Sequence, residues 1–233
     1  TSAAAVDYRK GIGLLEGIRG ANDDPEIVGR LAALYESLSI VSRSTGQYDV
    51  ARNYLEHSIT LREKVSRLRP ESSKSQYSLA IGYFSAAHQS IGDQQFATAE
   101  KFARLSLREF EAVASKTQSD SAQYNIALVT RLLAALKTKM GDGREALRYG
   151  RQALAIDLNR AKSGKINPEI LLDLSFDHNE LGDAFAVSKD FVRSLESYKR
   201  SQRVLEDLLQ KDPHSIRFKE RLADLYGQQG RLL

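Results

Sequence analysis

Four histidines are the side chains most able to bind a metal ion or exchange a proton near neutral pH. They are His57, His88, His178 and His214. Metal ligands on one helix are spaced three or four residues apart, and no two of these histidines are that close. Asp177 and Glu180 flank His178 but lie on different faces of a helix. The histidines therefore indicate neither a metal site nor an acid–base pair.

Two glycine pairs could be taken for phosphate-binding loops, Gly11-Ile12-Gly13 and Gly141-Asp142-Gly143. Neither follows a strand pattern, and neither ends in the Lys-Ser/Thr of a nucleotide-binding loop. Asp142 also lacks the further ligands of a calcium loop. The absence of cysteine excludes thiolate ligands and cysteine nucleophiles. We therefore expect no catalytic residue, no cofactor and no enzymatic activity in this segment.

Composition favours a globular, helical chain without a nucleic-acid or membrane partner. Of 233 residues, 42% are hydrophobic and 27% charged, and prolines number only 4. The net charge of +4 comes from basic residues interspersed with acids, as in Arg62-Glu63-Lys64, which is typical of solvated helix surface. No apolar run approaches the ~20 residues that span a bilayer. The start lacks a signal peptide and a methionine, so we expect a cytoplasmic fragment or processed chain.

Residue types recur at intervals of 47 or 48 along the whole chain. The clearest column is aliphatic: Leu31, Leu79, Ile126, Leu174 and Leu222. Two columns of small residues keep the same register: Ser58, Ser106, Ala153 and Ser201, then Ala51, Ala99, Ala146 and Ser194. Small side chains permit close helix packing, so we interpret these columns as seams between helices. A repeat of this kind stacks on its neighbours to bury its apolar faces.

Each repeat is predicted to contain two helices, because apolar residues within it are spaced by three, four and seven. The prolines fall between repeats, three of them after Asp or Asn, which is typical of helix starts. The sequence therefore predicts an all-α solenoid, a right-handed superhelix of helix-turn-helix repeats in one array over 1–233. We expect a second helix at 3–20, repeats at 25–67, 73–116, 120–163 and 168–211, and a first helix at 214–231.

The pattern resembles the tetratricopeptide repeat. Leu181-Gly182-Asp183, followed by Phe191, Leu195 and Tyr198, matches that family's Leu-Gly pair and its later aromatic position. The usual repeat has ~34 residues, so this one is longer. Long repeats with segments such as 174–183 are similar to the repeat tails of bacterial serine/threonine protein kinases. No kinase catalytic motif is present, so a kinase domain would lie outside this segment.

The resemblance implies a concave groove, lined by first helices, that binds a peptide or protein partner. Carried over by position, its candidate residues are Arg43, Phe84, His88, Arg131, Lys139, Phe176, Asn179 and Asp183. This set suits a peptide with one or two acidic groups. The alternative is that Arg43, Arg131 and Lys139 are merely solvated. By its register, His178 is interpreted as a packing residue.

Two other functions remain open. The terminal helices could expose apolar faces for a homo-oligomer, through Leu222, Leu225, Leu232 and Leu233. The chain could also be a ligand-sensing regulatory domain.

Overall fold

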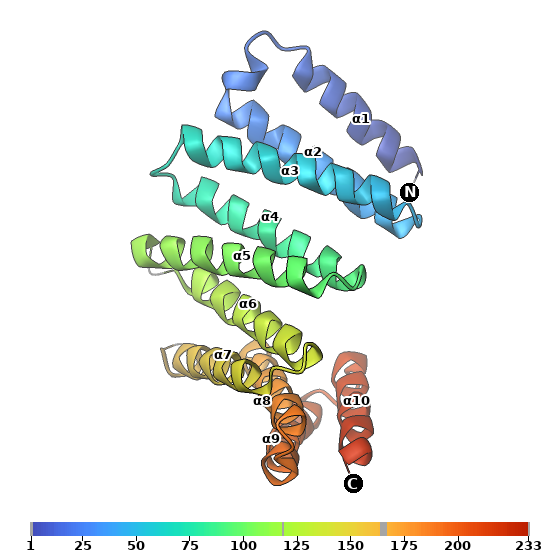
Figure 1. Cartoon of the computed structure of the whole chain (residues 1–233), viewed down its shortest axis with the longest axis vertical. Coiled ribbons are helices and arrows are strands. Elements are labelled where there is room, and N and C mark those ends of the chain that lie inside the picture. The colour runs from blue at the N-terminus through green and yellow to red at the C-terminus, as the bar shows by residue number, and fades with distance from the viewer. Residues whose placement is uncertain (1, 118, 164–166, 233) are drawn as a thin grey trace. The chain divides into compact units, whose positions relative to one another are not determined.

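A computed structural model describes residues 2–117, 119–163 and 167–232, and these form ten α-helices, one short 3₁₀ helix and no strand (Figure 1). The α-helices are α1 (Ser2–Glu16), α2 (Pro25–Ser44), α3 (Tyr48–Leu68), α4 (Ser73–Gly92), α5 (Phe96–Thr117), α6 (Asp120–Lys139), α7 (Gly143–Ser163), α8 (Pro168–Val187), α9 (Phe191–Lys211) and α10 (Ile216–Leu232). The all-α repeat fold that the periodicity predicts is confirmed.

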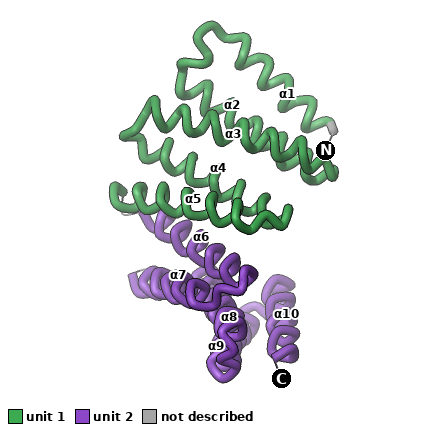
Figure 2. The backbone as a smooth tube through the Cα atoms, viewed as in Figure 1, with its two compact units in different colours: residues 1–118 green, residues 119–233 purple. Residues whose placement is uncertain are grey.

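The chain divides into two compact units, 1–118 and 119–233 (Figure 2). In unit 1, α2 packs on α3 and α4 on α5, while α1 lies against α2 and α3 against α4. In unit 2, α6 packs on α7 and α8 on α9, and α7–α8 and α9–α10 contacts join the pairs. α6 also contacts α8, so successive first helices lie side by side within this unit. Each unit thus stacks helix pairs in sequence order.

Helix starts follow the predicted capping residues. Asp24 accepts a hydrogen bond from the Glu26 amide at 2.8 Å, and Asn167 accepts one from the Ile170 amide at 2.9 Å. Each cap precedes a proline at the first helical position. The helix expected at 3–20 instead ends at Glu16, because Gly20 adopts a left-handed conformation (φ +80°) and redirects the chain into the 3₁₀ helix Ala21–Asp23.

The turns inside the helix pairs share one geometry. The second residue after the first helix of each pair is left-handed, at Gly46, Gln94, Gly141 and Lys189, which are again 47 or 48 residues apart. In each turn the next amide bonds back to a carbonyl five residues earlier, as Gln47 does to Ser42 and Asp190 to Phe185, both at 2.9 Å. This is the Schellman arrangement of a helix end. Gln94 and Lys189 adopt it without glycine, at a conformational cost.

The columns of small residues lie where helices pack closely, as predicted, and serines in these columns also make hydrogen bonds. Ala51, Ala99, Ala146 and Ser194 are fully buried. Ser58 donates to the Ala32 carbonyl at 2.8 Å and Ser106 to the Ala80 carbonyl at 2.9 Å. Ser201 likewise donates to the Ser175 carbonyl at 2.8 Å. A hydroxyl in this column therefore ties a second helix to the first helix of its own repeat.

The C-terminal helix corrects one expectation. Leu225 is only 2% exposed, and Leu222 and Leu232 are partly buried against the apolar cluster of α8 and α9 that contains Leu172 and Leu205. These three leucines therefore pack against the unit's own core and are not exposed as the sequence suggested, while Leu233 lies outside the described residues. The large apolar residues of α10 that are exposed are Ile216 and Tyr226.

Candidate functional site

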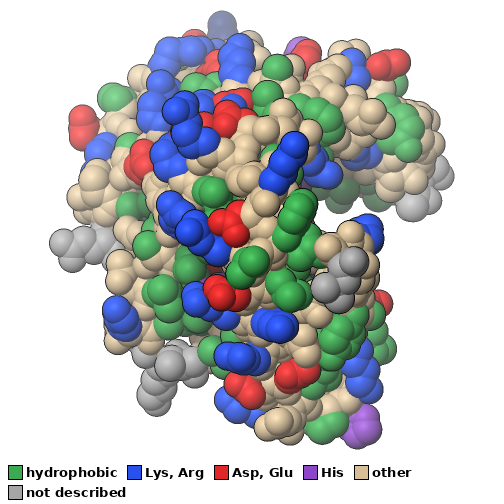
Figure 3. Space-filling model, turned by 60° about the horizontal axis from the view of Figure 1, so that its bottom comes forward, with side chains coloured by type: hydrophobic (Ala, Val, Ile, Leu, Met, Phe, Trp, Pro, Cys, Tyr) green, Lys and Arg blue, Asp and Glu red, His purple; other side chains and the backbone are tan. Residues whose placement is uncertain are grey.

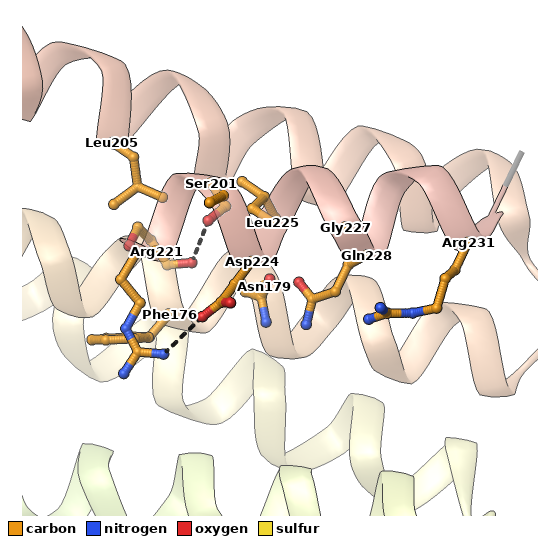
Figure 4. A pocket seen from close by; sticks show the side chains of 12 residues that line it. Phe176, Asn179, Ser201, Leu205, Arg221, Asp224, Leu225, Gly227, Gln228 and Arg231 are labelled. Carbon is orange, nitrogen blue, oxygen red and sulfur yellow. Dashed lines mark hydrogen bonds and ion pairs between the residues drawn. The ribbon is translucent and has the colours of Figure 1, made fainter. Parts of the chain in front are cut away.

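A pocket of about 340 Å³ opens between α8, α9 and α10 in unit 2 (Figure 4). Its lining is Ser175, Phe176, Asn179, Ser201, Leu205, Arg221, Ala223, Asp224, Leu225, Gly227, Gln228 and Arg231. Most of its polar side chains come from α10 and project toward α8, with Asn179 projecting from the opposite side. The pocket is therefore a cleft between two first helices.

One end of this pocket is internally paired. The Arg221 guanidinium lies 4.7 Å from the centroid of the Phe176 ring and 3.9 Å from the Asp224 carboxylate. A cation over an aromatic face is attracted by the ring's negative centre. Phe176 and the charges of Arg221 and Asp224 are thus already engaged, and they form the wall of the cleft.

The other end has polar side chains without partners. Among the described residues, Asn179, Gln228 and Arg231 make no hydrogen bond or ion pair with another side chain. The Gln228 amide oxygen is shielded from water as well as unbonded. An unsatisfied buried acceptor costs about 1–3 kcal/mol of stability, so this amide is a natural position for a ligand's donor.

A second pocket of about 330 Å³ shares Gln228 and Arg231 with the first, so the two adjoin. Its other lining residues are Thr138, Asp183, Ala186, Val187, Phe191, Tyr198 and Leu232. The Thr138 hydroxyl is also buried and unbonded. We call the two pockets together the α8–α10 groove. The groove runs along one face of α8, and polar side chains of α10 line its other side.

Asp183, the acidic residue of this second pocket, interacts with neighbouring side chains. The Tyr198 hydroxyl donates to Asp183 at 2.6 Å. Burial raises the pKa of Asp183, and the Tyr198 bond, Arg231 and Lys139 oppose that rise. Burial and the bond to Asp183 also raise the pKa of Tyr198. Asp183 therefore balances part of the positive charge of Arg231.

A buried ion-pair network occupies the interior of unit 2. Arg131 on α6 donates to Asp157 at 2.8 Å and to Asp177 at 2.7 Å, with Asp173 at 3.5 Å. Arg160 donates to Asp157 at 2.7 Å and to Asp173 at 3.3 Å. Burial acts to lower the pKa of Arg131, but the three carboxylates raise it. Arg131 is therefore used inside the fold and is not a solvated side chain.

The network holds more acids than bases, and Asp177 shows the effect. One oxygen of Asp177 accepts from Arg131, while the other is buried with no partner. Burial raises the pKa of Asp177 to about 8, Arg131 opposes the rise and Asp157 adds to it. A proton on the unpartnered oxygen would relieve its repulsion with Asp157. Nearby on α8, burial and Asp183 raise the pKa of Glu180 to about 7.

Unit 1 has a smaller cleft between its first helices, of about 250 Å³. Its lining is Glu36, Ser39, Ile40, Arg43, Leu55, Ser85, His88 and Gln89. Arg43 pairs with Asp93 at 3.4 Å and lies over the Tyr48 ring. His88 packs edge-on against Phe84, with ring centroids 4.5 Å apart, and desolvation lowers its pKa. Most polar groups here are paired within the unit.

The predicted groove residues thus divide into three groups. Asn179, Phe176 and Asp183 line the α8–α10 groove. Arg43 and His88 line the unit 1 cleft, beside Phe84. Arg131 is enclosed by carboxylates, and Lys139 is exposed at the end of α6.

His178 is half-buried, with its pKa lowered first by burial and then by Arg200. Sequence reasoning missed Gln228 and Arg231, because α10 was read only as an end helix. The register held the signal, since Gly227 corresponds to Asn179 and both missed residues follow it.

Surface charge and hydropathy add little to the site. On the face shown in Figure 3, basic side chains are interspersed with acidic and hydrophobic ones. No helix in the described part of the chain has an apolar stretch long enough to cross a bilayer.

Comparison with known proteins identifies the fold. BtubC (BKLC) from P. vanneervenii matches over 86% of this chain and 71% of its own, with a TM-score of 0.67 and 22% identity. This chain has a helical repeat fold. The designed helical repeat protein DHR64 matches 90% of this chain and 96% of its own at 15% identity, but its TM-score of 0.32 supports no further statement. No family model and no curated protein matches the sequence.

Proposed function

We propose that this chain is a tetratricopeptide-like scaffold whose α8–α10 groove binds an extended peptide segment of a protein partner. The observation that carries the proposal is the row of unbonded polar side chains along the groove, above all the buried amide oxygen of Gln228. Side-chain amides can accept from and donate to a peptide bond at once. Asn179 and Gln228 would therefore pair with the partner's main chain.

Charge and apolar contacts define the expected peptide. Arg231 has no ion pair of its own among the described residues, so it favours an acidic side chain or a terminal carboxylate. Val187, Phe191 and Leu232 line the second pocket and suit an apolar residue of the same segment. The preferred partner segment is extended, with one acidic group near one apolar side chain.

Selection from a library of random linear peptides tests this proposal. Peptides enriched on the wild-type chain should bind Gln228→Leu and Arg231→Leu at least about tenfold more weakly. Arg203→Leu is the matched control, because Arg203 is exposed on α9, makes no hydrogen bond or ion pair among the described residues and lines neither pocket. Enriched peptides that bind all three variants with wild-type affinity would refute the groove as the site.

We propose no catalytic role for this segment. The resemblance to kinase repeat tails suggests instead a recruiting or regulatory segment of a larger chain, such as a bacterial protein kinase. Turnover by the isolated chain, abolished by His178→Ala, would overturn this view.

Self-association is a second candidate, carried by α1 in place of α10. Leu14 is 76% exposed and Val6 46% exposed on this helix. Two exposed aliphatic residues on one helix suit a weak contact between copies. Light scattering over a range of concentrations tests it, with Leu14→Ser as the variant expected to remove concentration dependence.

A further inference from the structure

A pocket of about 330 Å³ in unit 1 is lined by basic side chains from three elements. Arg30 comes from α2, Arg69 from the residue that ends α3, and Lys74 from the first turn of α4. All three are exposed, and none has an ion pair or hydrogen bond among the described residues. Glu26 also lines the pocket, so three bases face one acid. This arrangement creates a positive potential at one place.

The start of α4 adds oriented donors to that potential. Ser72 caps the helix and accepts from the Ser75 amide at 3.2 Å. The first amides of a helix have no carbonyl partners within it, and its N-terminus carries partial positive charge. Because Ser72 and Lys74 both line the pocket, these donors border it.

Ser75 adds a side-chain donor at the same place. The residue is only 7% exposed and lines the pocket. Within the described part of the chain its hydroxyl makes no hydrogen bond but keeps contact with solvent, so it is open to the pocket. An unbonded hydroxyl beside three unpaired cations is available to donate to a ligand.

The rest of the lining is apolar. Pro25 and Ala33 of α2 and Val65 of α3 line the same pocket as the charged groups. A bare anion would use only the basic side, since it gains nothing from these carbons. An anion carried on a small organic group uses both sides.

We propose that this pocket binds a phosphomonoester, with its phosphate on Arg30, Arg69, Lys74 and the Ser75 hydroxyl and its organic part against Val65 and Pro25. A phosphate offers three acceptor oxygens and nearly two negative charges, which matches several convergent donors. A carboxylate offers only two oxygens and one charge. The site belongs to unit 1 and would bind independently of the α8–α10 groove.

Calorimetric titration with O-phosphoserine at constant ionic strength tests the proposal. Wild-type chain should bind it in the millimolar range or better, and more tightly at pH 7.5 than at pH 5, because the second phosphate pKa is about 6. Arg69→Gln/Lys74→Gln should weaken binding at least about tenfold, and Ser75→Ala about threefold or more. The matched control is Lys101→Gln, which removes an exposed charge on α5 and should leave affinity unchanged.

Three probes separate the source of the phosphate. A phosphoserine peptide that binds about tenfold more tightly than O-phosphoserine would support the site and indicate a modified protein segment as the source. O-phosphoserine that binds as tightly as the peptide, and more tightly than inorganic phosphate, would support the site and indicate a small phosphomonoester. Inorganic phosphate that binds as tightly as both would overturn the proposal, because the organic part would then contribute nothing. Equal binding of unphosphorylated serine peptide, wild-type affinity in the double variant, or no binding to the folded wild-type chain would overturn it.

Discussion

The two units place opposite charges at the same pair of repeat positions. In unit 1, Glu36 on α2 accepts from Arg62 on α3. In unit 2, Arg131 on α6 donates to Asp157 on α7. Glu36 and Arg131 each lie five residues after the aliphatic column, and the partner in each pair follows 26 residues later. Both units therefore have an ion pair at these two positions, but the acidic and the basic residue exchange places between the units.

The surroundings of the two pairs differ in charge. Arg62 also donates to the Ser58 and Ser78 hydroxyls, and Ser85 donates to Glu36, so hydroxyls complete the unit 1 pair. Gly82 gives room for it, because a Cβ there would lie 2.8 Å from Arg62 Cδ. In unit 2 the surrounding groups are further ionisable side chains, Asp173, Asp177 and Arg160. The first pair is satisfied by neutral groups and the second is a network with excess acid.

This difference explains which first-helix positions remain for binding. The column of Glu36 and Arg131 continues as Phe84 and Asn179. Its charged members hold adjacent helices together, and Phe84 packs on His88. Asn179 alone in this column faces a groove with its amide unbonded among the described residues. In such a repeat, the polar side chains that remain available to a partner are those that make no hydrogen bond or ion pair within the fold.

The largest effect is expected for Arg131→Met. It leaves Asp157 and Asp177 fully buried with one cation fewer, so the unfolding free energy should fall by about 3–5 kcal/mol. Denaturant unfolding at pH 7 measures it. Arg203→Met, at an exposed position of the same unit, should change stability by less than about 0.5 kcal/mol. A loss below 1 kcal/mol for Arg131→Met would show that the network is not needed.

Arg62→Met should cost less, about 1–3 kcal/mol. It leaves one carboxylate, Glu36, which is partly exposed and keeps its bond from Ser85. The same unfolding experiment ranks the two variants. A cost for Arg62→Met that exceeds that for Arg131→Met would contradict the view that excess acid makes the unit 2 network the more sensitive one.

Asp177→Asn should change the pH dependence of stability. The folded pKa of Asp177, about 8, lies above its unfolded value near 4, so the folded state holds its proton between these values. Its contribution to the stability of the folded state is full below about pH 4 and is lost as the pH rises to about 8. The variant should flatten this decline by about 1 kcal/mol or more between pH 5 and 8.

The control for this experiment is Glu180→Gln. Because the pKa of Glu180 is about 7, its contribution to stability also falls as the pH rises, but this fall ends at a lower pH. Between pH 7 and 8 the slope of stability against pH should therefore change more in Asp177→Asn than in Glu180→Gln. Parallel pH profiles for wild type and Asp177→Asn would mean that Asp177 is ionised throughout.

The smallest effect is expected at the turns. Lys189→Gly and Gln94→Gly place glycine at left-handed positions, and each should raise the unfolding free energy by up to about 1 kcal/mol. Gly46→Ala and Gly141→Ala should lower it by a similar amount. Thermal unfolding of the four variants compares equivalent turns in both units. A loss of stability in both glycine variants would show that the side chains of Gln94 and Lys189 stabilise their turns.

Features with a local or periodic cause could be predicted from the sequence. Small residues at Ala51 and Ala146 recur because each seam needs close packing, and Asp24 and Asn167 cap helices through bonds to their own neighbours. The buried network could not be predicted, because Arg131 and Asp177 are 46 residues apart and belong to different columns. The opposite charges of Arg62 and Asp157 in one column were a signal in retrospect.

The groove was predicted only in part for the same reason. Asn179 and Asp183 follow from the register of a first helix. Gln228 and Arg231 depend on α10 packing its leucines inward, which turns its polar face toward α8. Hydropathy alone could not show whether those leucines meet a neighbour or remain exposed.

The central claim is that the unbonded amides of the α8–α10 groove receive a partner's main chain. Side-chain amide resonances report this directly, since the Asn179 and Gln228 signals can be assigned from Asn179→Asp and Gln228→Glu variants. Titration with a library-selected peptide should shift both pairs of signals, in proportion to binding, while the Gln152 amide on α7 stays unchanged. Saturation by the peptide with both groove amides unshifted would contradict the account.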